Sequence, residues 1–159
     1  MVLGRLLCPT AVSLTNMKPN EGRLQTAEHI LAHILENRDV VAKVVIAKFE
    51  EKAGLLEVSS AEDLRKIDFP NLQTEVNRVI MKNLPVNKYF VNRVAAESEF
   101  DLRRIPSSVS EIRIVEICGF DKTPCKDPHV ENTNEIGFFS LLSVVRAGKN
   151  RYRFCFRVD

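Results

Sequence analysis

Hydrophobic residues recur at helical spacing in the segment that follows residue 20. Leu24, Ala27 and Leu31 lie three or four positions apart, and neither Pro nor Gly interrupts the run after Gly22. This periodicity predicts an amphipathic helix over residues 21–37, with one apolar face turned toward a core.

The next part of the chain switches to short runs rich in β-branched residues. Val and Ile dominate residues 40–49, and Gly54 separates them from a second run at 55–58, which predicts a hairpin. Ser60-x-x-Asp63 is a capping pattern that predicts a helical start, and Pro70 is typical of the first turn of a helix that ends near Asn83. The further elements that we expect are strands at 88–94, 112–117, 136–145 and 151–158 and a short polar helix at 95–100.

Strands and helices come in clusters and do not alternate strictly, which predicts the fold class. We expect an α+β fold, in which a mainly antiparallel sheet is packed by helices in two layers. The length of 159 residues suits one domain with a real core. Residues 1–20 are expected to form an N-terminal strand or arm, and residues 21–159 a single domain.

The composition indicates the class of protein, its cellular location and the partners to expect. Hydrophobic residues make up 45% and charged residues 28%, the balance of an ordinary globular protein. No apolar run reaches the roughly 20 residues that span a bilayer, so no membrane partner is expected. Cysteine usage without a Cys-x-x-Cys spacing favours a reducing, cytoplasmic location. The formal net charge of +2 means that the field of the whole protein attracts nucleic acid only weakly, so RNA contacts must come from a local patch. No DNA partner is expected.

Two segments carry candidate chemistry. Cys125-Lys-Asp-Pro-His129 places a thiol and an imidazole four residues apart on a Pro-containing loop, a spacing that lets both converge on a divalent metal. Gln25, His29 and His33 are successive i, i+4 positions on the predicted helix, and their stripe borders the apolar face. The side chain of His29 can therefore enter a cleft. Alternatively, it lies at the edge of the core, where one hydrogen bond satisfies it. His33 is expected at the surface or behind the site.

Together the segments Leu24-Gln-Thr-Ala-Glu-His29 and Cys125-Lys-Asp-Pro-His129-Val-Glu-Asn-Thr133-Asn-Glu135-Ile-Gly137 resemble a known split motif. It belongs to the editing domains shared by alanyl- and threonyl-tRNA synthetases and by freestanding alanyl-tRNA editing proteins. In that family the halves read His-x-x-x-His and Cys-x-x-x-His, followed by a Thr-Gly-Glu-Ile-Gly type of tail. Here Gln25 replaces the first His, and Asn134 stands where Gly is usual.

The resemblance implies an enzyme of translation fidelity. Such a protein is a trans-editing hydrolase that deacylates mischarged tRNA, seryl- or glycyl-tRNA of the alanine type, by ester hydrolysis at the tRNA acceptor end. It also implies that His29, Cys125 and His129 hold zinc, with Gln25 as a weak ligand or replaced by water. Thr26 lies beside them and is expected to contact a small polar substrate, or else to be a residue of the helix start.

Three alternatives follow from the same residues. In the first, the site residues act by hydrogen bonding without metal, as in the threonyl-type domains that remove serine, because Gln is a poor zinc ligand. In the second, the chain is a catalytically degenerate module that binds tRNA or a synthetase. A third alternative is an unrelated zinc-stabilised structural domain, which chelation should unfold.

The last strand suggests an RNA contact. A period of two puts Tyr152, Phe154, Phe156 and Val158 on one face, which is expected to be core. Arg151, Arg153 and Arg157 take the other face, where they would either meet phosphate oxygens or form a solvated surface. Of the remaining cysteines, Cys118 and Cys155 are expected to fill the core, and Cys8 carries no signal.

Overall fold

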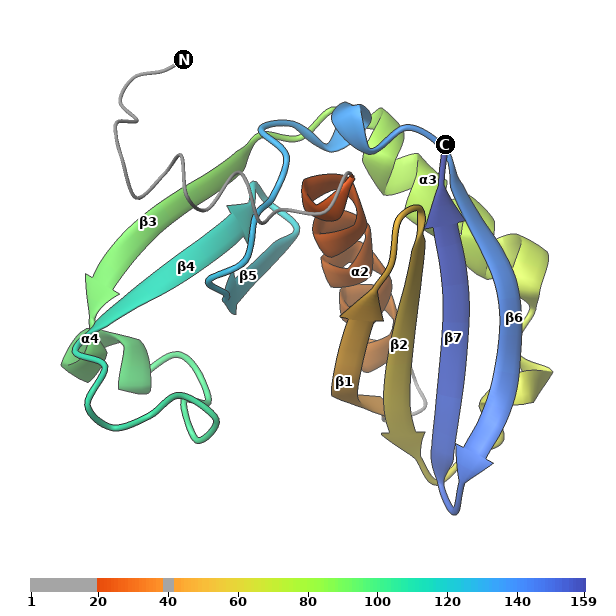
Figure 1. The fold of residues 1–159 in the computed structure, drawn as a ribbon, viewed down its shortest axis with the longest axis horizontal. Helices are drawn as coiled ribbons and strands as arrows, with labels where there is room; N and C mark the ends of the chain where they lie inside the picture. The colour runs from red at the N-terminus through yellow and green to blue at the C-terminus, as the bar shows by residue number, and fades with distance from the viewer. Residues whose placement is uncertain (1–19, 39–41) are drawn as a thin grey trace.

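A computed structural model describes residues 20–38 and 42–159 of the chain, and the arrangement of its elements is shown in Figure 1. The helices are α2 (Glu21–Glu36), α3 (Phe69–Met81) and α4 (Arg93–Glu97), with short 3-10 turns η2 (Leu64–Lys66) and η3 (Thr133–Ile136). The strands are β1 (Ala42–Phe49), β2 (Ala53–Ser60), β3 (Val86–Asn92), β4 (Glu111–Ile117), β5 (Asp121–Pro124), β6 (Phe139–Gly148) and β7 (Arg151–Val158). The expected arm at 1–20 and the start of the 40–49 strand lie outside the described residues, except for Asn20.

The strands form two antiparallel sheets, so the predicted α+β class with antiparallel pairing is confirmed. The larger sheet has the order β1-β2-β7-β6, and the smaller has the order β3-β4-β5. Helices α2 and α3 lie against the larger sheet, and α2 stands between the two sheets (Figure 1). This layer of helices on a sheet is the predicted one. The separate second sheet was not expected from the sequence.

The core forms where α2 and α3 meet the inner face of the larger sheet. Residues that are fully buried there include Leu24 and Leu31 of α2 and Phe154 and Phe156 of β7. The period of two predicted for β7 is therefore correct, because its alternate residues are buried. The ring of Phe156 stacks on Phe139 with centroids 5.3 Å apart, which fixes β6 beside β7.

Strand β4 joins the two halves of the fold because both of its faces are buried. Ile112 and Ile114 belong to a small core under α4, whereas Val115 and Ile117 belong to the main core. A strand that is buried on both faces has no need of strict alternation. The apolar residues of β4 therefore attach the smaller sheet, and the loop that follows it, to the rest of the molecule.

Several predicted boundaries are wrong, each for a local reason. The capping pattern at Ser60 does not start a helix: Asp63 accepts a hydrogen bond from Arg65 N, and only the turn η2 follows. Helix α4 starts earlier than predicted because Asn92 caps it. The strand expected from residue 136 begins at Phe139, since Thr133–Ile136 form the capped turn η3. Residues 121–124, for which no strand was expected, form β5 by pairing with β4.

The glycine that ends the tail segment is required by the backbone conformation at its position. Gly137 ends η3 with φ of 84°, in the left-handed region that favours glycine. A Cβ there would also collide with the carbonyl oxygen of Asp159.

Among the described residues, no helix is both long and apolar enough to cross a membrane.

Candidate functional site

Helix α2 presents one polar stripe to a cleft between the two sheets. Gln25, His29 and His33 line this cleft together with Glu28, and the opposite walls come from β1 and from the segment after β5. The cleft has a volume of about 1510 Å³ and is open to solvent. The i, i+4 stripe predicted from the sequence therefore faces a cavity wide enough for a substrate.

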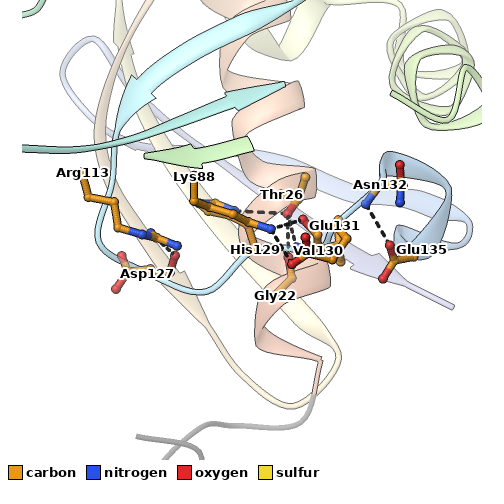
Figure 2. Close-up of polar contacts among 10 residues, drawn as sticks. All are labelled: Gly22, Thr26, Lys88, Arg113, Asp127, His129, Val130, Glu131, Asn132 and Glu135. Atoms are coloured by element: carbon orange, nitrogen blue, oxygen red, sulfur yellow. Dashed lines mark hydrogen bonds and ion pairs between the residues drawn. The ribbon is translucent and has the colours of Figure 1, made fainter. Parts of the chain in front are cut away.

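The loop that carries Cys125 and His129 is held to the smaller sheet by long basic side chains of β3 and β4 (Figure 2). Arg113 Nη1 donates to the carbonyl oxygens of Cys125 at 2.9 Å and Asp127 at 3.0 Å. Lys88 Nζ donates to the carbonyl oxygen of Val130 at 2.9 Å. Because each cation binds main-chain oxygen, these contacts fix the path of the loop.

The structure brings together three of the residues predicted to bind metal. One ligand atom each from His29, Cys125 and His129 lies within 4.8 Å of the others. The two imidazole rings meet edge to face, with centroids 4.5 Å apart. His29 comes from α2 and His129 from the loop, so a helix and a segment far along the chain build one centre.

One ring nitrogen of each histidine in this cluster is buried without a hydrogen-bond partner among the described residues. Within the described part of the chain, His29 Nδ1 and His129 Nε2 are buried and have no hydrogen-bond partner. Asp121 Oδ2 lies 3.8 Å from His29 Nδ1, which is too long for a hydrogen bond. Buried nitrogens are rarely left unpaired without a function, and a metal ion would satisfy them. The residues present therefore fit a zinc ion, for which imidazole and thiolate are the usual ligands.

Burial sets the protonation of the cluster. It lowers the pKa of His29, and it lowers the pKa of His129 to about 2, with the neighbouring His29 and Arg113 adding to the effect. Burial also raises the pKa of the Cys125 thiol to about 11. That thiol donates a weak hydrogen bond to Asp127 Oδ2 at 3.8 Å. At neutral pH the rings are therefore uncharged and offer lone pairs, and the thiol must lose its proton before it can bind metal.

Gln25, which stands at the position of the first His of the split motif, lies on the cleft wall one turn before His29. Its side chain is buried, at 6% exposure. His33 stands apart from the cluster: its Nδ1 is 2.9 Å from Asp121 Oδ1, and its ring packs on Phe120 with centroids 4.3 Å apart. His33 is thus a supporting residue at the edge of the cleft, one of the two places expected for it.

Thr26 does not occupy the place that a substrate contact requires. The residue is 0% exposed, and its hydroxyl is taken up by Gly22, His129 and Val130. Thr26 directly follows Gln25 on the helix, so its side chain points in a different direction from the Gln25–His29 stripe. The predicted contact between Thr26 and a small polar substrate is therefore wrong in this structure.

The arginine face of β7 is neutralised by acidic neighbours. Arg151 and Arg153 form ion pairs with Glu57 at 2.8 and 3.1 Å, and Arg157 pairs with Asp159 at 3.1 Å. This face lies opposite the one that packs on α2. These contacts favour the solvated-surface interpretation over phosphate binding. Cys155 is half-buried on the same face and Cys118 is half-buried, so neither is the core filler expected.

Sequence reasoning missed one acidic residue of the cleft. Glu28 is 8% exposed, and its pKa is raised to about 8 by burial and by the negative charges of Glu36, Asp121 and Asp127. The available signal was its position directly before His29 on the helix. Asp121 holds His33 and belongs to β5, which the sequence did not predict.

Comparison with known proteins adds a relationship to this geometry. Residues 112–154 match the family described as the threonyl and alanyl tRNA synthetase second additional domain. The chain is 28% identical over 139 residues to the alanyl-tRNA editing protein AlaX-M of Methanosarcina acetivorans, covering 84% of this chain and 56% of that protein. It is 31% identical over 135 residues to AlaX-L of Pyrococcus horikoshii, covering 84% of this chain and 33% of that protein.

An alanine–tRNA ligase of Methanococcus vannielii is 29% identical over 130 residues, which cover 78% of this chain and 14% of the ligase. The chain thus spans about half the length of the AlaX-M relative and a third of AlaX-L. Most of the chain takes part in these similarities, and the family match at 112–154 includes the second half of the split motif.

Proposed function

We propose that the chain belongs to the family of the threonyl and alanyl tRNA synthetase second additional domain and that it is an aminoacyl-tRNA deacylase, as its similarity to that domain and to the AlaX proteins supports. The reaction is hydrolysis of the ester between a wrong amino acid and the 3′-terminal ribose of a tRNA. Water adds to the acyl carbon, the ester C–O bond breaks, and the ribose leaves as a hydroxyl. The observation that carries the proposal is the convergence of His29, Cys125 and His129 at one end of an open cleft.

We propose zinc as the cofactor of this site. His29, Cys125 and His129 would hold the ion, and Gln25 or water would complete its coordination. When bound, zinc would polarise the ester carbonyl or acidify water. His29 and Cys125 line the cleft and would lie closest to the ester, whereas His129 is seated behind them against α2.

The charges of the cleft fit the two ends of such a substrate. Asp121 and Asp127 lie on the walls around the cluster and would attract the α-ammonium group of an aminoacyl ester. Lys43 and Lys48 of β1 line the same cleft and would meet phosphates of the acceptor end. RNA contact is therefore expected along β1 and not at the arginine face of β7. Since charged tRNA is the proposed substrate, we place the protein in the cytoplasm.

A catalytically degenerate binding module remains the second candidate, because Gln25 stands in place of the first His of the family motif. The two are separated by hydrolysis assays on alanine tRNA charged with serine, glycine or alanine, and on threonine tRNA charged with serine. We expect seryl- and glycyl-tRNA of the alanine type to be hydrolysed and alanyl-tRNA to be mostly spared. Hydrolysis of seryl-tRNA of the threonine type alone would indicate the threonyl-type activity. Binding of tRNA without hydrolysis of any substrate would show the degenerate module.

A further inference from the structure

Thr26 has a hydroxyl group that makes three contacts in the protein interior. Its Oγ1 lies 2.8 Å from the carbonyl oxygen of Gly22, 3.1 Å from His129 Nδ1 and 3.2 Å from the amide nitrogen of Val130. Figure 2 shows these contacts at the junction of α2 and the loop. A side chain that is 0% exposed acts on the site through the residues that it contacts.

The Thr26 hydroxyl carries a single proton, and this determines which partner donates in each of its three hydrogen bonds. A hydroxyl group donates one hydrogen bond and accepts two. The Gly22 carbonyl can only accept, so it takes the single hydroxyl proton, while the Val130 amide can only donate. The remaining contact with His129 is therefore a bond in which Nδ1–H donates to Thr26 Oγ1.

We propose that Thr26 is a positioning residue that fixes His129 as the Nδ1–H tautomer and directs the lone pair of Nε2 into the buried space beside His29. In a neutral imidazole one nitrogen carries the proton and the other is the acceptor, and the hydrogen bond of one nitrogen selects the state of the other. His129 Nε2 is the atom left buried without a partner. The Nδ1–H form makes that atom a metal ligand, whereas the opposite tautomer would place a proton there.

Gly22 makes this arrangement possible from one turn earlier on α2. A Cβ at position 22 would lie 3.3 Å from the carbonyl carbon of His129 and 3.6 Å from the amide nitrogen of Val130. The missing side chain lets the His129–Val130 peptide approach the helix closely enough to reach Thr26. Gly22 and Thr26, four residues apart on one face, form the seat of the ligand loop.

The inference deepens the proposed function, since its consequence for metal binding rests on the proposed zinc site, whereas the tautomer itself does not. The test is long-range ¹H–¹⁵N NMR of the metal-free protein at neutral pH. The chain has only three histidines, and the His129 signals are assigned by their loss in His129→Ala. We expect a protonated, pyrrole-type Nδ1 and a bare, pyridine-type Nε2 in the parent protein and in Thr26→Ser. A protonated Nε2 in the parent protein would overturn the proposal.

Zinc affinity supplies the second readout. Thr26→Val keeps the shape of the side chain but removes the hydroxyl, and should weaken zinc binding by about 10-fold to 100-fold, the usual effect of losing a group that orients a ligand. Thr26→Ser should retain the parent affinity. An unchanged affinity and an unchanged tautomer in folded Thr26→Val would contradict the proposal. If Thr26→Val does not fold, the spectrum of the parent protein still decides. A parent protein with the expected tautomer that binds no zinc would overturn the proposed cofactor and leave the role of Thr26 standing.

Discussion

The rings of His29 and His129 meet edge to face, with centroids 4.5 Å apart and planes inclined at 70°. Two imidazolium cations at this separation, out of contact with water, would repel each other strongly. The pair is therefore neutral, and each ring keeps one nitrogen free for a ligand. A helix residue and a loop residue thus provide two of the donors that zinc prefers, with the Cys125 thiol beside them.

Zinc binding should release about one proton near pH 7. The histidines are already uncharged because burial lowers their pKa, whereas burial raises the pKa of the Cys125 thiol to about 11, so only the thiol has a proton to lose. Below that pKa the affinity should therefore rise about tenfold with each pH unit. Calorimetry in buffers of different ionisation enthalpy measures the proton count, with Cys125→Ser as the control that loses this proton. Release of no proton by the parent protein would show that the thiol is not a ligand.

Gln25→His should tighten zinc binding about tenfold or more, the change that 1.4 kcal/mol of added binding free energy produces. Residue 25 lines the cleft one turn before His29, and an imidazole there would complete the ligand set of the family motif. A competition titration against a chelator of known affinity measures the change, and Gln25→Ala is the matched control that should give no gain. Equal affinities of the histidine variant and the parent protein would mean that position 25 does not face the metal.

Glu28 should make the folded protein less stable as the pH rises. Its pKa in the folded state is raised to about 8 from 4.5, first by burial and then by Glu36, Asp121 and Asp127. The contribution of Glu28 to the free energy of unfolding is fully present below pH 4.5. It is lost as the pH rises toward 8, because the unfolded protein releases the proton over this range while the folded protein keeps it. The loss is about 1.4 kcal/mol per pH unit where it is steepest.

Glu28→Gln removes this titration and keeps the shape of the side chain. Urea unfolding of both metal-free proteins between pH 5 and pH 8 should show the variant gaining stability relative to the parent protein as the pH rises. Contributions of the histidines cancel in the difference between the two proteins, and Cys125 of the folded protein keeps its proton over this pH range because burial raises its pKa to about 11. A difference that does not vary with pH would show that Glu28 is ionised and solvated in the folded protein.

Much of the fold could be predicted from the sequence because several elements have a strong local signal. The helical period fixed α2, and the alternation of Tyr152, Phe154 and Phe156 gave the buried face of β7. Strand β5 carried no such signal, since Asp121-Lys-Thr-Pro is short and polar and becomes a strand only by pairing with β4. The division into two sheets depends on contacts between distant segments, which periodicity does not report.

The candidate site was predictable in part for the same reason. The spacing of Cys125 and His129, with His29 upstream, indicated a shared centre, and the structure places all three together. The role of Thr26 was not predictable, because its hydroxyl is used by a loop more than 100 residues later in the chain. Glu28 was overlooked because a glutamate on a helix is ordinarily solvated. Its environment is unusual because the fold buries it and brings the negative charges of Glu36, Asp121 and Asp127 close to it.

Deacylation of seryl-tRNA of the alanine type tests the central claim most directly. The assay compares the zinc-loaded parent protein, the same protein after chelation and after zinc is restored, and the variant His129→Ala. We predict hydrolysis by the parent protein, its loss on chelation and its return with zinc. His129→Ala should reduce the rate by about 100-fold or more while the fold, followed by circular dichroism, is retained. Hydrolysis by His129→Ala at the parent rate would contradict the account of this site as the centre of an editing hydrolase.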